Sequence, residues 1–176
     1  MNLNIRFFIS VFFISVFFAS CNNTQEEKKI DYAKVQNTMM KVNKIMVKNE
    51  DSKIDEFITN SKLPYKETGS GLRFYILSPG KGDFIEEENV VTLLCDISSL
   101  DSITYYSSKE DGPKTFRVGK GGVASGLEEG VKLLKNGAEA SFILPSHLAY
   151  GLIGDEKRIP PKEILLYNVK VIDVKQ

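Results

Sequence analysis

The sequence has no tryptophan, one histidine and two cysteines, and its charges cancel. Lys and Arg together number 23, as do Asp and Glu, so no global basic field indicates a nucleic-acid partner. No cluster of Cys or His has the spacing of metal ligands, so we expect no metal site and no cofactor. The only histidine, His147, is expected to be a structural hydrogen-bonding residue and not a catalyst.

The first residues have the pattern of an export signal. An apolar run at 7–18 follows Arg6, and it is too short to span a bilayer but typical of a secretory signal. It ends in Phe-Ala-Ser-Cys at 18–21, which resembles a bacterial lipobox. We therefore predict a lipoprotein signal at 1–20 and lipidation of Cys21, which would anchor the protein to the cell envelope. The expected location is the outer membrane, with the domain facing the periplasm. The alternatives are an unlipidated secretory signal and an uncleaved anchor.

A polar tether at 21–29 precedes a predicted helical arm and linker at 30–70. The arm is expected to contain one helix at 30–48 and a second at 51–59, followed by a linker at 62–70 that contains Pro and Gly. Apolar residues of the first helix recur at helical spacing and share one face, and these are Val35, Met39, Val42 and Met46.

This apolar stripe of the arm has two interpretations. It packs on its own domain, or it binds a second copy or a client, in which case a homodimer would form through 30–58.

The period changes from helical to strand-like after Gly71. We expect strands near 72–77, 90–97, 103–106, 115–118, 138–144 and 164–174, and one short helix after 123 whose inward residues are Leu127, Val131 and Leu134 and which stops at Gly137. This pattern predicts an α+β domain at 71–176, with an antiparallel sheet wrapped around one short helix. Residues 144–161 combine apolar side chains with Pro and Gly, so they are expected to form an ordered loop that shapes an apolar site. Cys95 lies in a strand pattern and is expected to be a small buried residue.

Four motifs occur in order along this domain. Gly-Leu-x-Phe-x-Ile begins at Gly71, Val-Ala-Ser-Gly-Leu-Glu-Glu-Gly fills 123–130, Pro-Ser-x-x-Ala-Tyr-Gly fills 145–151, and Ile-Pro-Pro fills 159–161. The combination resembles the FKBP-type peptidyl-prolyl cis/trans isomerases over about 71–175. With the lipobox and the arm added, the whole chain is similar to the gliding-motility-associated FKBP-type lipoproteins of Bacteroidetes.

The resemblance implies rotation of X–Pro peptide bonds in proline-containing segments of exported proteins, in a dry pocket without a metal or a nucleophile. It assigns a donor hydroxyl to Tyr150 and a donor backbone N–H to Ala124, which follows Val123. The resemblance also suggests pocket walls and a floor, which are Ile159, Tyr167, Leu127, Phe116, Tyr105 and Tyr106. Core packing is an equal alternative for Leu127 and Phe116.

The sequence departs from the family pattern at the pocket. Tyr-Tyr-Ser-Ser at 105–108 replaces the usual Phe-Asp before Ser-Ser, and Lys114 stands where an aromatic residue is common. Near Leu94 and Cys95 an expected tyrosine is missing, and Gly122 replaces an acid. We therefore expect low or narrow activity. The alternative is a catalytically weak or inactive domain that acts as a periplasmic chaperone or assembly subunit, and an interaction protein without proline preference is a third hypothesis.

Overall fold

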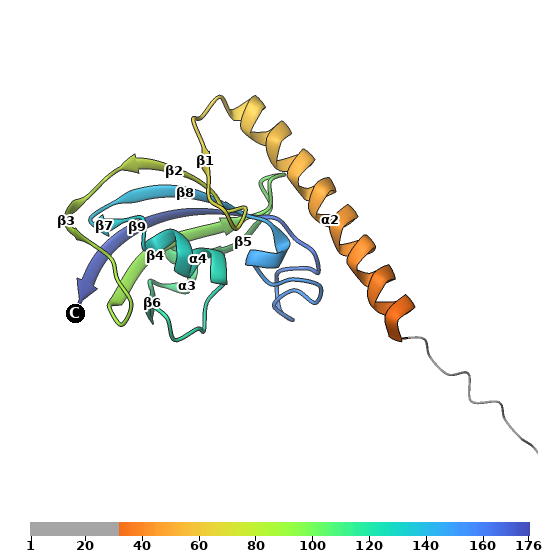
Figure 1. The fold of residues 1–176 in the computed structure, drawn as a ribbon. Coiled ribbons are helices and arrows are strands. Elements are labelled where there is room, and N and C mark those ends of the chain that lie inside the picture. The colour runs from red at the N-terminus through yellow and green to blue at the C-terminus, as the bar shows by residue number, and fades with distance from the viewer. Residues whose placement is uncertain (1–31) are drawn as a thin grey trace, which may run out of the picture. The chain divides into compact units, whose positions relative to one another are not determined.

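The computed structural model describes residues 32–176, with side chains from Val35 onward (Figure 1). Residues 40–176 form one compact unit, and the described residues before Met40 belong to another. The predicted signal at 1–20, the lipidation site Cys21 and the tether at 21–29 lie outside the described residues. Within the described range, no helix combines the length and the apolarity that a membrane span requires.

A single helix, α2 (Tyr32–Ser61), occupies the region where two helices were expected. The prediction of separate helices at 30–48 and 51–59 was wrong, because the polar stretch between them continues the helix and carries buried contacts, with Glu50 only 9% exposed. The helix ends before Lys62, whose φ of 57° is left-handed and terminates the helical geometry.

The apolar residues of α2 fall into two groups. In the first part of the helix most apolar side chains from Val35 onward are open to solvent, with Met39 62% and Ile45 61% exposed, while Met46 is partly buried. Near the end of the helix, Ile54 is fully buried in a small cluster with Ile143 and Ile164. The second part of α2 is therefore packed on the domain, within the unit 40–176.

The main sheet is antiparallel and has the order β1-β2-β8-β9-β4-β5, with β6 paired to β4. Its strands are β1 (Lys66–Glu67), β2 (Arg73–Ser78), β4 (Val90–Ser98), β5 (Thr104–Ser107), β6 (Lys114–Arg117), β8 (Glu139–Leu144) and β9 (Leu165–Lys175). A second, small sheet pairs β3 (Lys81–Phe84) with β7 (Lys135–Asn136), and neither strand was predicted. The expected linker at 62–70 also contains a strand, because β1 pairs with β2.

The helix α4 (Ser125–Val131) packs on the inner face of this sheet, as an α+β fold with one short helix requires (Figure 1). Leu127, Val131 and Leu134 are buried as predicted. The helix ends at Val131, however, and does not extend to Gly137 as expected. Gly130 allows the close approach, since a Cβ there would lie 2.8 Å from the ring of Phe142. Two further turns are α3 (Ser108–Asp111) and the 3-10 helix η1 (Ser146–Leu148).

One row of side chains crosses the inner face of five strands. The pairing places Tyr106 of β5 opposite Ile97 of β4, Ile97 opposite Tyr167 of β9, Tyr167 opposite Phe142 of β8, and Phe142 opposite Phe74 of β2. Residues directly opposite each other in antiparallel strands point to the same side of a sheet. The sheet thus presents an almost entirely aromatic row, whose β5 end is the part that the 144–161 loop reaches.

Candidate active site

A cavity of about 300 Å³ lies where the aromatic row meets the 144–161 loop. Its walls come from β4, β5, the start of β6 and the loop, and they are formed by Ile97, Tyr106, Lys114, Tyr150, Asp155 and Lys157. Of the predicted site residues, the structure brings Tyr106 and Tyr150 together on these walls. Ile97, Asp155 and Lys157 were not predicted.

Asp155 organises the loop side of the cavity. Its Oδ1 accepts hydrogen bonds from the backbone N–H groups of Lys157, Arg158 and Ile159, at 3.0, 2.9 and 2.7 Å. Its Oδ2 accepts a short hydrogen bond from the Tyr106 hydroxyl. Burial favours the neutral acid, but the hydrogen bonds from Tyr106 and the backbone outweigh it and lower the pKa of Asp155. The carboxylate is therefore ionised at neutral pH.

Tyr106 is held between this carboxylate and a cation. The Arg158 guanidinium stacks over the Tyr106 ring at 4.7 Å, and it also pairs with Asp111 at 3.0 Å. The hydrogen bond to Asp155, followed by burial, raises the pKa of Tyr106 to about 12. The Tyr106 hydroxyl stays protonated and is engaged with Asp155, so the ring is the part of this side chain that faces a ligand.

Tyr150 and Tyr167 form the interior side of the site. Burial raises the pKa of Tyr150, and burial together with the neighbouring Tyr150 hydroxyl raises the pKa of Tyr167 well above its usual value. The Tyr167 hydroxyl is buried without a well-formed hydrogen bond to any described residue. Both tyrosines are therefore neutral, and Tyr150 is the one whose side chain reaches the cavity wall.

The inward position of Lys114 follows from strand register. Lys114 lies opposite Leu93, which is fully buried, whereas the adjacent Thr115 pairs with Thr92 on the outer face, where their hydroxyls lie 3.0 Å apart. Strand alternation therefore directs Lys114 to the cavity side of the sheet. The sequence signal for this placement was the period of two in β6, in which buried Phe116 follows two residues later.

Four further predicted residues do not line the cavity. Leu127 and Phe116 belong to the hydrophobic core, and so does Ile159, which is 3% exposed. Tyr105 faces other groups, since burial followed by the Glu163 carboxylate raises its pKa. Their proposed contacts with a substrate stay predictions.

Ala124 and Val123 stand at the start of α4. The Ala124 carbonyl accepts the N–H groups of Leu127 and Glu128 at 3.0 and 3.2 Å. The Ala124 N–H donates to no group within 32–176, although the residue is 3% exposed. A backbone donor without an acceptor is consistent with the predicted hydrogen bond to a substrate carbonyl.

The loop is fixed where it begins by a residue from α2. The Glu50 carboxylate accepts hydrogen bonds from the Ser146 N–H at 2.8 Å and the Ser146 Oγ at 2.6 Å, and both residues are buried. Next to them, the His147 Nε2 lies 3.1 Å from the carbonyl oxygen of Ser70, a structural hydrogen bond of the kind predicted. Neither contact could be found from local sequence.

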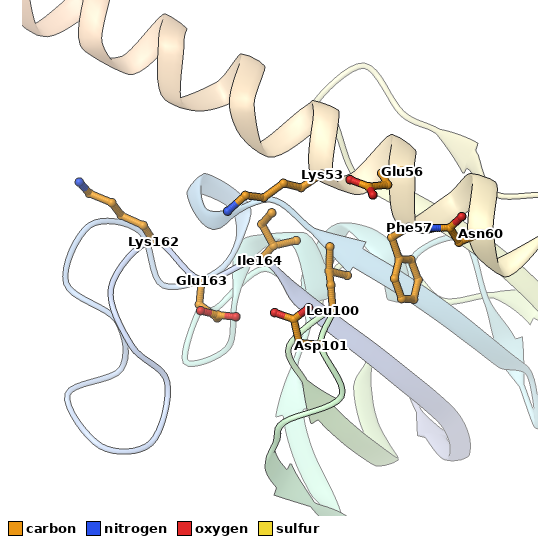
Figure 2. A pocket seen from close by; sticks show the side chains of 9 residues that line it. All are labelled: Lys53, Glu56, Phe57, Asn60, Leu100, Asp101, Lys162, Glu163 and Ile164. Carbon is orange, nitrogen blue, oxygen red and sulfur yellow. The ribbon is translucent and has the colours of Figure 1, made fainter.

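A larger cavity, of about 440 Å³, lies between α2 and the segments that flank β5 and β9 (Figure 2). Figure 2 shows Phe57, Leu100 and Ile164 near one another, with charged side chains around them. The charged and amide side chains of this lining are Lys53, Glu56, Asn60, Asp101, Lys162 and Glu163. This cavity contains none of the predicted site residues, and it lacks the aromatic wall of the smaller one.

The smaller cavity is suited to binding and not to bond cleavage. One part of its wall combines an aliphatic side chain with two tyrosine rings that can hold an apolar group, and the charged side chains of Lys114, Asp155 and Lys157 form the other part. Burial raises the pKa of the nearby Cys95 thiol, which is 5% exposed as predicted and is therefore a poor nucleophile. No group of three or more His, Cys, Asp or Glu side chains suited to a metal occurs within 32–176.

Comparison with known proteins relates this arrangement to one family. The profile described as FKBP-type peptidyl-prolyl cis-trans isomerase matches residues 80–172. The chain is 37% identical over 110 residues to a probable FKBP-type peptidyl-prolyl cis-trans isomerase FkpA of Neisseria meningitidis, covering 62% of this chain and 40% of that protein. It is 31% identical over 106 residues to the peptidyl-prolyl cis-trans isomerase Fkbp12 of Drosophila melanogaster, covering 59% of this chain and 98% of that protein.

Solved structures agree on the fold. A peptidyl-prolyl cis-trans isomerase from Pseudomonas syringae matches with a TM-score of 0.62 at 26% identity, covering 76% of this chain and 96% of that chain. FkpA from Escherichia coli matches with a TM-score of 0.64 at 24% identity, covering 98% of this chain and 82% of that chain. This chain spans less than half the length of the first curated relatives it matches, at 40% and 45%.

Proposed function

The chain belongs to the FKBP-type peptidyl-prolyl cis-trans isomerase family, and on this premise we propose that it catalyses rotation about X–Pro bonds in the cavity beside Tyr150. The observation that supports this most is the meeting of Tyr150, Tyr106 and Ile97 on one cavity wall. Their side chains would receive the prolyl ring.

The chemistry requires only a selective environment. Rotation of the X–Pro bond passes through a twisted amide, and the barrier to peptide-bond rotation is about 18–20 kcal/mol. The twisted form has lost resonance, so its carbonyl is less polar than that of the planar form. The part of the wall formed by Ile97 and the two tyrosine rings would disfavour the polar planar amide, while the Tyr150 hydroxyl and the Ala124 N–H would hold the substrate backbone in place. No covalent bond to the protein forms.

Proline exchange in short peptides, followed by NMR, tests this proposal. Tyr150→Phe removes one neutral hydrogen-bond donor, which is expected to lower the catalysed rate about threefold to tenfold. Tyr75→Phe is the matched control, because this half-buried tyrosine packs against Tyr65 on the outer side of β2 and does not line the cavity. Exchange at background with the unaltered protein would contradict catalysis.

A second function is favoured by the absence of an acid from β5 in the cavity and by the inward Lys114. The domain would then bind proline-containing segments as a chaperone or assembly subunit, possessing little or no catalysis. Peptides that bind while their exchange stays at background would support this alternative over the first.

The clients we propose are exported proteins of the cell envelope, and the lipobox at 18–21 supports this. Cys21 would carry the lipid anchor and hold the domain at the periplasmic side of the outer membrane. The most specific role that we propose is in gliding machinery. Cys21→Ala should abolish incorporation of a labelled fatty acid and release the protein from membranes. Persistent labelling would contradict the anchor.

A homodimer through 30–58 is proposed from the exposed apolar residues of α2. Val42 is 48% and Met39 62% exposed, and an apolar helical stripe of this kind is a common pairing surface. Sedimentation of the protein and of a Met39→Lys, Val42→Lys variant distinguishes the states. A monomer at high concentration would contradict the dimer, and a dimer that dissociates in the variant would support it.

A further inference from the structure

Two lysines at the cavity have no acidic partner. Lys114 points to the cavity side through its register with Leu93, and Lys157 lines the cavity from the loop. Lys114 is partly buried and Lys157 is exposed. Neither takes part in an ion pair or a side-chain hydrogen bond with another described residue. This contrasts with Lys120, Lys132 and Lys170 elsewhere on the domain, each of which pairs with a glutamate.

The other charged groups of the site already have hydrogen-bond or ion-pair partners. Asp155 is the only acid on the cavity wall, and its two oxygens accept four hydrogen bonds from Tyr106 and from the backbone of 157–159. Arg158 pairs with Asp111 and stacks on Tyr106. The donors to Asp155 are neutral and leave its negative charge in place, so the charges of Lys114, Lys157 and Asp155 on the cavity wall sum to +1.

We propose that these lysines select proline-containing segments with an acidic residue next to the proline. The inference rests on the proposed function, because it places the prolyl ring against Tyr150, Tyr106 and Ile97. With the ring there, the side chain on either side of the proline lies at the cavity rim. A carboxylate at the rim balances this net positive charge, and a cationic side chain is repelled by it.

Exchange rates in four matched peptides test the preference. One peptide has Glu before the proline, the second has Gln there, the third has Lys, and the fourth has Glu directly after the proline. The ion pairs between the peptide carboxylate and Lys114 or Lys157 would be partly exposed to solvent. We therefore expect the Glu peptides to be isomerised about twofold to fivefold faster than the Gln peptide, and the Lys peptide to be slower by a similar factor. The Glu-to-Gln ratio should approach one as the salt concentration is raised toward about 1 M, where the screening length is about 3 Å.

A double variant, Lys114→Gln with Lys157→Gln, should bring the Glu-to-Gln ratio close to one at low salt. Lys53→Gln is the matched control, since this exposed, unpaired lysine of α2 lies at the other cavity and should leave the ratio unchanged. The ratio is compared within each protein, so a general loss of activity does not mimic the result.

The outcomes separate this inference from the function on which it rests. Catalysis of the Glu and Gln peptides at equal rates would overturn the acidic preference and leave the isomerase proposal intact. Tighter binding of the Glu peptide without catalysis, lost in the double variant, would support the preference and contradict the enzyme. Neither catalysis nor binding with any peptide would overturn both.

Discussion

Two carboxylates fix the 144–161 loop, one near its start and one within it. Glu50 comes from α2 and is 9% exposed, and among the described residues its carboxylate bonds only to Ser146, a residue 96 positions away. Asp155 lies in the loop, and its Oδ1 bonds only to neighbours within four positions, with the Tyr106 hydroxyl added from β5. Both are satisfied acceptors, yet the first joins distant elements and the second shapes a local turn.

The difference shows which contacts hold the site and which shape it. Glu50 ties the loop to α2, and its neighbour Asp51 lies 3.1 Å from the buried Arg73 of β2, which also lies 3.4 Å from Glu67 of β1. Asp155 orients Tyr106 and the backbone that leads to Ile159. Loss of the first should destabilise the domain as a whole, whereas loss of the second should alter the cavity with a smaller effect on folding.

The largest effect is expected from Gly154→Ala, next to Asp155. Gly154 has φ of 74°, and a Cβ there would lie 2.2 Å from the backbone oxygen of Ile159, so the backbone must move. We expect a loss of about 4 kcal/mol in the free energy of unfolding, measured by urea denaturation. Gly151→Ala is the control, since its φ is 62° but nothing lies within 4 Å, and only about 1 kcal/mol is expected. Equal losses would show that the close approach is not what constrains the loop.

Glu50→Ala comes next in size. It leaves the buried N–H and hydroxyl of Ser146 without their acceptor, which is expected to cost about 3 kcal/mol. Urea denaturation gives the value, and increased amide exchange at Ser146 should accompany it. Glu56→Ala, an exposed acid of the same helix without an ion pair among the described residues, should change stability by less than about 0.5 kcal/mol. A small loss for Glu50→Ala would mean that water replaces the carboxylate.

This comparison also explains what sequence reasoning could reach. The fold class was predictable because strand alternation, the buried positions of α4 and the 144–161 loop are local patterns. The division of α2 into two helices was wrong, because Glu50 and its polar neighbours looked like a break and only the folded domain shows their buried partners. The short β1, β3 and β7 depend on pairing partners far along the chain.

The candidate site was predictable in its aromatic part and not in its charged part. Tyr150 and Tyr106 stand in or near recognisable motifs, and both reach the cavity wall. Asp155 was missed, although an aspartate after Gly in a loop commonly bonds to backbone N–H groups a few residues on. That its second oxygen would bind Tyr106 of β5 depends on how the loop folds over the sheet.

The contribution of the Asp155 charge to stability can be tested by changing the pH. The pKa of Asp155 is lowered on folding, so its contribution to stability is fully present above the ordinary value of 3.8 and is lost as the pH falls through the folded pKa. Asp155→Asn should therefore be less stable than the unaltered protein at pH 6, by less than the loss in Glu50→Ala, and the gap between the two should be smaller at pH 3. Urea denaturation at both pH values measures the gap. A gap that does not change with pH would show that the charge of Asp155 is not the stabilising feature.

The smallest effect on folding is expected at Tyr167, whose buried hydroxyl makes no well-formed hydrogen bond within 32–176 although it lies beside the Tyr150 hydroxyl. Tyr167→Phe removes an unpaired polar group, so the free energy of unfolding should stay level or rise by up to about 1 kcal/mol. Tyr65→Phe is the contrast, because the Tyr65 hydroxyl lies 2.8 Å from Ser141 Oγ, and its loss should cost about 1 kcal/mol. If Tyr167→Phe is stable but isomerises proline peptides more slowly, the Tyr167 hydroxyl acts on the site through its neighbour Tyr150. If Tyr167→Phe is instead less stable, the Tyr150 hydroxyl or a bound water satisfies the Tyr167 hydroxyl, and its role is structural, like that of Glu50.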